Sequence, residues 1–364
     1  MTSRIVLLGA TGYTGALTAE ALVARGARPV LAGRNPDKLT LLAERLGGLE
    51  TARADVTDPA AVRALLDPGD VLVTTVGPFL RLGEPAVAAA TEAGAVYLDS
   101  TGEPPFVRRV FEEFGPRADR ATLVPAFGLD YVPGNLAGAL ALAAAGDRAH
   151  RLDVGYSLQG AHGQAFSRGT LVSSMGVLFE PGFAFTGGRL APETPGHRTW
   201  RFEAGGRRRQ GLSIGGSEHL TLPALAPSLR EVGVYLDWLG PATGPAHLLS
   251  PLTGLAARIP GAGRAAQRVA EAVGRRVAEG PSAGNERSAR AVTVAEVRDR
   301  GGERVARVVL EGPEPYRFTA AMLAWGATTA AADGVRTTGA AGPVQAFGLE
   351  ALTAGAAEAG LVRA

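Results

Sequence analysis

Cysteine is absent from this sequence of 364 residues. Its absence excludes disulfide bonds, thiolate nucleophiles and cysteine metal sites. Lysine is almost absent as well, because Lys38 is the only one and arginine supplies the other basic residues. Any mechanism that depends on a catalytic lysine would therefore have to use Lys38.

Long apolar runs and a large excess of one charge are also missing. No run reaches the roughly 18 apolar residues that a membrane-spanning helix needs. The first apolar stretch, residues 5–8, is too short and wrongly flanked for a signal peptide, so we expect a cytoplasmic protein. The formal net charge is +2, and the basic cluster Arg207–Arg209 follows two glycines, as the arm of a hairpin would. Nucleic acid is therefore not an expected partner.

The chain is long enough for two domains, and its first 130 residues have the pattern of a parallel sheet. Short apolar runs alternate there with helical patterns, two of which begin at Asn-Pro or Asp-Pro. The strand-like runs are 5–8, 29–32, 51–54, 71–76, 96–99 and 122–126. This repetition predicts an α/β fold with a Rossmann-type, doubly wound parallel sheet and right-handed crossovers.

The pattern changes after about residue 130. Glycine pairs typical of hairpins join some of the later strand-like runs. These runs are 152–158, 198–204, 211–214, 230–236, 289–297 and 304–310, with helical patterns at 168–178, 246–258 and 264–277. We expect a Rossmann domain over residues 1–130 and an α+β domain with a mostly antiparallel sheet over 131–339. The C-terminal segment 340–364 contains a short helix that can pack back on the first domain.

The first strand runs directly into a glycine-rich turn that opens a helix. The turn reads Gly9-Ala10-Thr11-Gly12-Tyr13-Thr14-Gly15. Gly9 suits a tight turn, Gly12 lets the backbone approach a pyrophosphate, and Gly15 lets the helix pack closely on the sheet. The N-terminus of the helix offers N–H groups and the positive end of its dipole to phosphates. Strand, turn and helix together predict a dinucleotide site with the spacing G-x-x-G-x-x-G.

The choice of cofactor is read at the end of the second strand, about 20 residues after the turn. NAD-specific sites place Asp or Glu there, whereas this sequence has Gly33-Arg34-Asn35, with Lys38 one helical turn later. A carboxylate would repel a 2′-phosphate, but an arginine can hold it with two charge-assisted hydrogen bonds and stack on the adenine. We therefore predict NADPH/NADP+ as the cofactor. The alternative is a surface arginine beside a helix cap.

Two further strand ends should border the cofactor, because ligands of this fold lie outside the carboxyl ends of the strands. Asp55 and Val56 follow the third strand, on the adenine side. Val76, Gly77 and Pro78 follow the fourth strand, on the nicotinamide side. FAD is less favoured than NADPH, since FAD sites also prefer an acid after the second strand.

The composition excludes three common chemistries of this fold. Short-chain dehydrogenases need a Tyr-x-x-x-Lys pair, but the only lysine belongs to the cofactor region. Semialdehyde and acyl-phosphate reductases need a cysteine nucleophile. Zinc alcohol dehydrogenases need cysteine and histidine ligands, and the five histidines show no metal spacing, so no metal site is predicted. Direct hydride transfer remains, with a proton from a side chain or from water.

Several segments resemble landmarks of the saccharopine dehydrogenase-like NADP-binding proteins. They are Gly9–Gly15, Ala32–Arg34, Tyr97–Glu103, Gly128–Pro133, Ser167–Thr170 and a stretch from Gly312 through Tyr316 and Thr319 to Gly348. The resemblance covers most of the chain, and the first 130 residues are its more specific part. It implies a Rossmann domain, an inserted α+β domain for substrate and dimer contacts, and a homodimer. Family members include amino-acid dehydrogenases and the trans-acting enoyl reductases of actinobacterial lipid and polyketide pathways.

The sequence departs from the lysine-pathway members of that family. The paired basic residues that a two-carboxylate substrate such as saccharopine requires are not found. We therefore expect an NADPH-dependent oxidoreductase that reduces an activated C=C, with C=N or C=O as variants, in a mostly apolar small-molecule or lipid/polyketide-type substrate. The alternatives are a non-catalytic NADPH-binding sensor and an accessory subunit of a larger synthase. The large second domain, with its glycine-rich loops, favours an enzyme with a substrate cleft.

Four side chains are candidates for the chemistry. Glu103, Asp130 and Tyr131 follow the fifth and sixth strands, where the nicotinamide should lie, and His162 lies in a glycine-flanked loop. Tyr131 carries a proton at neutral pH and Asp130 can orient it, so Tyr131 is the favoured proton donor. His162 is the rival, because its ordinary pKa suits acid chemistry. Glu103 can instead cap a helix, Asp130 can hold a turn, His162 can be merely solvated, and water can supply the proton.

Overall fold

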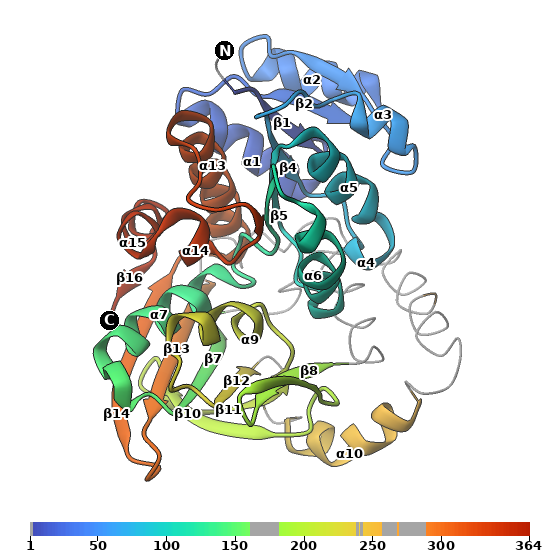
Figure 1. Ribbon diagram of the computed structural model, residues 1–364. Coiled ribbons are helices and arrows are strands. Elements are labelled where there is room, and N and C mark those ends of the chain that lie inside the picture. Colours follow the sequence, from blue (N-terminus) through green and yellow to red (C-terminus); the bar gives the residue numbers. More distant parts are fainter. Residues whose placement is uncertain (1–2, 161–181, 238–239, 241–242, 257–267, 269–288) are drawn as a thin grey trace. The chain divides into compact units, whose positions relative to one another are not determined.

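The computed structural model describes residues 3–160, 182–237, 240, 243–256, 268 and 289–364 (Figure 1). The chain divides into two compact units, each with its own sheet. Unit 1 consists of Met1–Thr101, Phe106–Val132 and Tyr316–Ala359, and unit 2 of Gly102–Pro105, Pro133–Pro315 and Gly360–Ala364. The helical pattern at 168–178, that at 264–277 apart from residue 268, the Ser167–Thr170 motif and His162 lie outside the described residues.

Unit 1 contains a parallel sheet of seven strands in the order β15-β6-β5-β4-β1-β2-β3. The strands are β1 (Ile5–Leu8), β2 (Val30–Gly33), β3 (Thr51–Arg53), β4 (Val71–Thr74), β5 (Val96–Asp99), β6 (Thr122–Val124) and β15 (Gly339–Ala340). Every residue of β1, β2 and β4 is buried, as expected for strands covered on both faces. The predicted doubly wound sheet is confirmed. Its order reverses between β1 and β4, where ligands of such sheets bind.

Helices cover this sheet. They are α1 (Tyr13–Ala24), α2 (Pro36–Arg45), α3 (Pro59–Arg63), α4 (Phe79–Leu82), α5 (Glu84–Ala93), α6 (Pro104–Arg109), α13 (Pro315–Asp333), α14 (Pro343–Phe347) and α15 (Leu349–Glu358), with a π-turn at Val110–Phe114 and a 3-10 turn at Gly115–Arg117. The predicted caps are present: Asn35 accepts a hydrogen bond from the backbone N–H of Lys38, and Asp58 caps α3. The main core lies between one sheet face and α3, α5 and residues 106–114.

Helix α13 packs in unit 1 although it follows the second sheet in the chain. It runs beside α1, because Tyr316 contacts Tyr13 near the start of both helices and the Arg25 guanidinium donates to Thr328 near their other ends, at 3.1 Å. The Trp325 ring of α13 also packs on Phe347. The apolar α13 thus completes the core of the Rossmann unit, so residues 316–333 belong to unit 1 and not, as the sequence pattern predicts, to the second domain.

Unit 2 contains a nine-stranded, mostly antiparallel sheet, as predicted. Its main path is β10-β11-β12-β7-β13-β14-β16, and only the pairing of β7 with β12 is parallel. The strands are β7 (Arg151–Gln159), β8 (Phe183–Thr186), β9 (Arg189–Pro192), β10 (Thr199–Ala204), β11 (Arg207–Ile214), β12 (Glu231–Leu236), β13 (Arg290–Arg298), β14 (Arg304–Gly312) and β16 (Val362–Arg363). The expected hairpins at Gly205-Gly206 and Gly301-Gly302 are confirmed, so Arg207–Arg209 does begin a hairpin arm.

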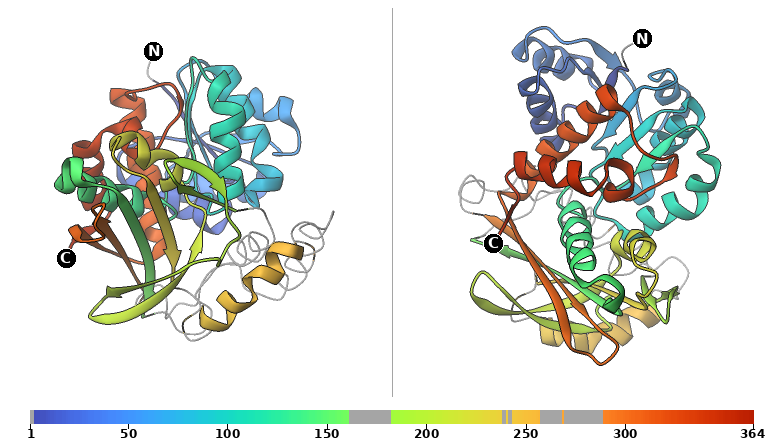
Figure 2. Two further views of the ribbon diagram at one scale, coloured as in Figure 1. Left: turned by 60° about the horizontal axis from the view of Figure 1, so that its bottom comes forward. Right: turned by 60° about the vertical axis from the view of Figure 1, so that its left-hand side comes forward.

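The two faces of the second sheet have different covers. Helix α7 (Val132–Ala145) packs on one face, where a Cβ added to Gly138 would lie 3.2 Å from Leu152. On the other face the β10–β11 hairpin curls back (Figure 2). Phe202 of this hairpin packs there on Val292 and Val294 of β13. Short helical segments complete the unit: α9 (Glu218–Thr221), α10 (Thr243–Ala256) and 3-10 turns at Gly146–Arg148 and Leu222–Leu225. Within the described ranges, no helix is both long and apolar enough to cross a membrane.

Candidate functional site

The three glycines of the turn after β1 have different surroundings. Gly9 has a φ of +88°, and a Cβ there would lie 2.7 Å from Val76. A Cβ on Gly15 would lie 2.1 Å from the Gly9 carbonyl oxygen. A Cβ on Gly12 would meet only that oxygen, at 3.4 Å, which is close to an ordinary contact. Folding therefore requires glycine at positions 9 and 15, whereas Gly12 leaves open space beside the turn.

The N-terminus of α1 suits an anion. Gly12 is its N-cap, no side chain caps it, and its first turn holds no acidic residue. The first N–H groups of a helix lack partners within the helix and carry the positive end of its dipole. Together with the open space at Gly12, this arrangement fits the pyrophosphate of a dinucleotide.

The end of β2 lies beside the glycine turn. A Cβ on Gly33 would be 4.0 Å from the Thr11 hydroxyl oxygen, so the two segments are neighbours. Arg34, Asn35 and Lys38 follow and are exposed. The Asn35 side chain oxygen accepts the Lys38 N–H at 3.0 Å, so it serves the helix cap.

Asp55 follows β3 and lies near Arg34, which follows β2. Its carboxylate accepts the backbone N–H of Thr57 at 2.9 Å and the Thr57 hydroxyl at 2.7 Å. These two hydrogen bonds lower the pKa of Asp55, and the nearby charges of Arg34 and Arg53 lower it further. Asp55 is therefore ionised at neutral pH and lies among arginines that follow or end β2 and β3. The neighbouring Val56 is buried in the core, so only its backbone is available to a ligand.

The segment after β4 packs against the glycine turn from the other side. The Thr75 hydroxyl donates to the Gly9 carbonyl at 3.2 Å, and the Val76 side chain lies against Gly9. The peptide bond between Gly77 and Pro78 is cis. The predicted segments 9–15 and 76–78 are therefore brought together at the switch point of the sheet.

Asp99 joins the loops that follow β5 and β6, a role that the sequence pattern does not predict. Its buried carboxylate accepts the N–H groups of Thr101 at 2.8 Å and Ala126 at 2.7 Å, and the Tyr97 hydroxyl at 2.6 Å. Burial and the Asp99 charge raise the pKa of Tyr97 well above its ordinary value, so this hydroxyl keeps its proton. The sequence indicates that Tyr97 and Asp99 can contact each other, because residues two apart in a strand share one face.

The loop after β6 carries two of the predicted catalytic residues. The Tyr131 side chain is buried, its N–H donates to the Ala126 carbonyl at 2.8 Å, and the Asp130–Tyr131 peptide bond is cis. Asp130 is half-buried, and burial raises the pKa of its carboxyl to about 7. Asp130 can therefore exchange a proton near neutral pH.

The first turn of α13 contacts both the glycine turn and the loop that carries Asp130. The sequence does not predict this part of the site. The Tyr316 ring meets the Tyr13 ring edge-on, with centroids 5.2 Å apart. The Thr319 hydroxyl accepts the Leu129 N–H at 3.1 Å, one residue before Asp130. No local pattern predicts this placement, because it depends on the return of a distant helix to the first sheet.

Three other candidates, Glu103, Ala10 and His162, have different outcomes. Glu103 is buried and belongs to unit 2, and His162 lies outside the described residues. Ala10, within the turn, is also fully buried. Across the part of the chain that the structure describes, no group of three or more acidic or histidine side chains is placed to hold a metal ion.

Comparison with known proteins agrees with this geometry. The family model for NAD(P)H-binding domains matches residues 9–97, from the glycine turn to β5. The chain carries an NAD(P)H-binding domain. A solved structure of apo saccharopine dehydrogenase (L-Glu forming) from Saccharomyces cerevisiae matches 98% of this chain and 96% of its own, with a TM-score of 0.58 and 13% identity. The fold is saccharopine dehydrogenase-like.

Mycobacterial proteins share sequence with part of this chain. A provisionally named trans-acting enoyl reductase of Mycobacterium tuberculosis (strain ATCC 25618 / H37Rv) is 40% identical over 185 residues, which is 48% of this chain and 44% of that protein. The trans-acting enoyl reductase of Mycobacterium ulcerans (strain Agy99) is 40% identical over 140 residues, 36% of this chain and 34% of that protein. The matches thus span less than half the length of these relatives.

Proposed function

We propose that this chain is an NADPH-dependent reductase that acts on an activated C=C bond of a mostly apolar, lipid- or polyketide-type substrate. The observation that carries the proposal is the glycine turn, where Gly12 leaves space beside an uncapped helix N-terminus. The names of the mycobacterial relatives support the C=C bond as the reducible group.

The preference for NADPH over NADH rests on the charges around the end of β2. Arg34 and Lys38 are exposed there, and Arg34 and Arg53 both lie close enough to Asp55 to lower its pKa. Guanidinium groups bind phosphate with paired, charge-assisted hydrogen bonds, and a lysine adds a mobile positive charge. NADPH carries a 2′-phosphate that these cations could bind, whereas NADH lacks this phosphate.

The chain's own residues would hold the cofactor and deliver the proton. Bound NADPH would supply a hydride, which adds to the β-carbon of a conjugated enoyl group and leaves an enolate. We assign the proton that completes the α-carbon to the Tyr131 hydroxyl, and its return from solvent to Asp130, whose pKa is about 7. His162 and water remain the rival proton donors, Glu103 remains a candidate residue near the nicotinamide, and C=N or C=O reduction remains a variant. A homodimer with the substrate in the second domain stays a prediction from the family resemblance.

The test is oxidation of NADPH by the purified full chain in the presence of defined acceptors. We expect turnover with a medium-chain trans-2-enoyl thioester, slower turnover with NADH, and the saturated thioester as the product by mass spectrometry. A cyclic imine and saccharopine, the latter assayed with NADP+ in the reverse direction, serve as competing substrates. Tight NADPH binding without turnover of any acceptor would instead indicate a sensor or an accessory subunit.

A further inference from the structure

The second sheet carries rows of charged side chains on the face that the β10–β11 hairpin covers in part. Directly paired residues of neighbouring strands share a face. The register pairs Asp153 with Glu296 and Glu296 with Arg307 across β7, β13 and β14. The next row along the strands pairs Arg151 with Arg298 and Arg298 with Arg304.

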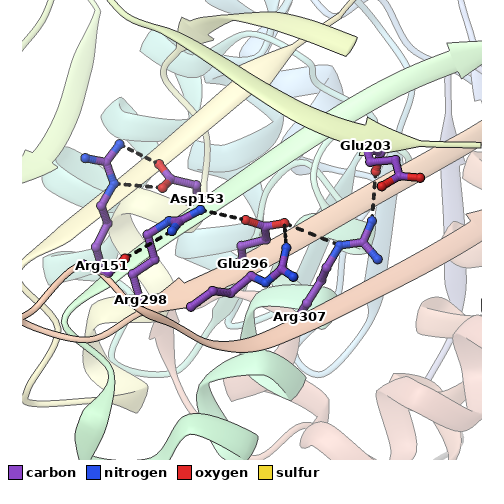
Figure 3. A network of polar contacts seen from close by, with 8 residues as sticks. Arg151, Asp153, Glu203, Glu296, Arg298 and Arg307 are labelled. Carbon is purple, nitrogen blue, oxygen red and sulfur yellow. Dashed lines mark hydrogen bonds and ion pairs between the residues drawn. The ribbon is translucent and has the colours of Figure 1, made fainter. Parts of the chain in front are cut away.

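These rows have one end around Asp153 and another around Glu296, and the balance of positive and negative charge differs between the two ends (Figure 3). Arg151 donates to both oxygens of Asp153, at 2.8 and 3.0 Å, and also meets Glu231 at 3.3 Å. One cation therefore meets two carboxylates. At the other end, Glu296 alone meets three guanidinium groups: Arg304 at 3.0 Å, Arg298 at 3.2 Å and Arg307 at 3.4 Å. A single carboxylate cannot neutralise three arginines, so this end has excess positive charge.

These arginines open onto a surface cavity of about 400 Å³, which we call the arginine groove. Its five arginines are Arg201, Arg208, Arg298, Arg304 and Arg307. Glu203, Glu296 and Phe202 complete the lining, so five positive charges face two negative ones. The volume is within the range of about 300–1,000 Å³ that is usual for small-molecule sites.

The groove is held in shape by its own contacts. The Arg307 guanidinium donates to the Glu203 carbonyl at 3.0 Å, which ties β14 to the β10–β11 hairpin. The Arg298 guanidinium donates to the Gly302 carbonyl at 3.1 Å. The Glu296 side chain is only 7% exposed, and its carboxylate forms ion pairs with three of the guanidinium groups. The Arg304 side chain, in contrast, is 52% exposed. Guanidinium groups that are already positioned lose less freedom when they bind a ligand.

From this surplus of fixed, accessible guanidinium groups we propose that the arginine groove is a binding site for a phosphate or pyrophosphate group of a small molecule. Arginine forms paired hydrogen bonds with phosphate oxygens, and a dianion or trianion matches the surplus charge. The site belongs wholly to unit 2, so it differs from the glycine turn and does not depend on the proposed reductase activity.

Calorimetric titration of inorganic pyrophosphate into the full chain tests the proposal. The titration is done at constant ionic strength without NADP+, because NADP+ carries phosphate groups of its own and would compete for the groove. We expect saturable binding of one pyrophosphate in the groove, and the variants of groove residues separate this binding from any at the glycine turn. The double variant Arg298→Gln/Arg304→Gln should lose at least about tenfold in affinity, because two charge-assisted contacts are removed. Arg189→Gln is the matched control, since Arg189 is exposed in β9 and does not line the groove.

A gain of affinity provides a second, independent test. Glu296→Gln removes the carboxylate that competes with the ligand for the arginines, so pyrophosphate should bind several-fold more tightly to this variant. The proposal fails if the wild-type chain shows no saturable binding, or if the double variant binds as well as Arg189→Gln does. Binding of an acidic peptide without binding of pyrophosphate would also overturn it, in favour of a protein-docking surface.

Discussion

At the scale of single residues, Arg34 is the most direct test of cofactor choice. Arg34→Ala should weaken NADPH binding much more than NADH binding, because the charge-assisted contact with the 2′-phosphate exists only with NADPH. A hydrogen bond to a charged group contributes roughly 1.5–3 kcal/mol, which corresponds to about one to two decades in Kd. Fluorescence titration with both cofactors measures the difference. Equal losses for NADPH and NADH would contradict the assignment.

Tyr131 tests the proton donor. Tyr131→Phe removes the hydroxyl but keeps the buried ring, so NADPH affinity should be unchanged. General acid catalysis typically contributes about 10²–10⁴-fold, so turnover should fall at least about tenfold. His162→Ala is measured in parallel. Normal turnover in Tyr131→Phe combined with a loss in His162→Ala would move the donor role to His162, and no loss in either would leave water as the acid.

Asp130 should make stability depend on pH. Burial raises the pKa of its carboxyl from 3.8 to about 7, so the folded chain holds this proton more tightly than the unfolded chain does. The favourable contribution of the protonated Asp130 carboxyl to the free energy of unfolding is therefore complete below the pKa that this group has in the unfolded chain. It is lost as the pH rises to about 7 and does not change above that pH. A difference of about three pKa units corresponds to at most about 4 kcal/mol.

The Asp130→Asn variant lacks this titration and serves as the reference. Urea unfolding of both proteins at about pH 5 and about pH 8 should show that the wild-type chain loses more stability over this interval than the variant. Parallel losses in the two proteins would show that Asp130 titrates in the folded chain as it does in the unfolded chain.

At the scale of elements, two glycines of the turn between β1 and α1 have different roles. Gly15 is needed for folding, and Gly12 for binding of the cofactor. Gly15→Ala would place a Cβ 2.1 Å from the Gly9 oxygen, so α1 must move and stability should fall by about 1–3 kcal/mol or more. Gly12→Ala meets only one atom, at 3.4 Å, and should cost less than about 1 kcal/mol. NADPH affinity should nevertheless fall in Gly12→Ala, because the Cβ occupies the space next to the pyrophosphate.

Thermal unfolding and NADPH titration of the two glycine variants distinguish these roles. A Gly12→Ala chain that binds NADPH as well as wild type would remove the turn from the cofactor site. A Gly15→Ala chain of unchanged stability would show that α1 can shift without cost.

At the scale of the whole molecule, the candidate cofactor residues all belong to unit 1. A ligand that binds only the folded state stabilises it by about 2.7 kcal/mol at a concentration 100 times its Kd. Saturating NADPH should therefore slow hydrogen exchange most in β1, β2 and β4. The β8–β9 hairpin of unit 2, which does not line the arginine groove, is the internal control and should exchange as before. Protection of the hairpin without protection of the glycine turn would contradict the placement of the cofactor.

The sequence alone determined the features that depend on neighbours along the chain. Alternating apolar runs specified the parallel sheet, Asn35 and Asp58 specified two helix starts, and the spacing of Gly9, Gly12 and Gly15 specified the dinucleotide turn. Each of these signals acts over a few residues through backbone geometry and local hydrogen bonds, so it can be read without knowing the fold.

Only the tertiary structure decided which distant segments meet. Asp99 joins two loops because β5 and β6 are neighbours, and Thr319 supports the Asp130 loop because α13 returns to the first sheet. Glu296 gathers three arginines because the register of β13 and β14 places them together. Such contacts follow from strand order and helix packing, which are set by burial of apolar surface over the whole unit and not by any local pattern.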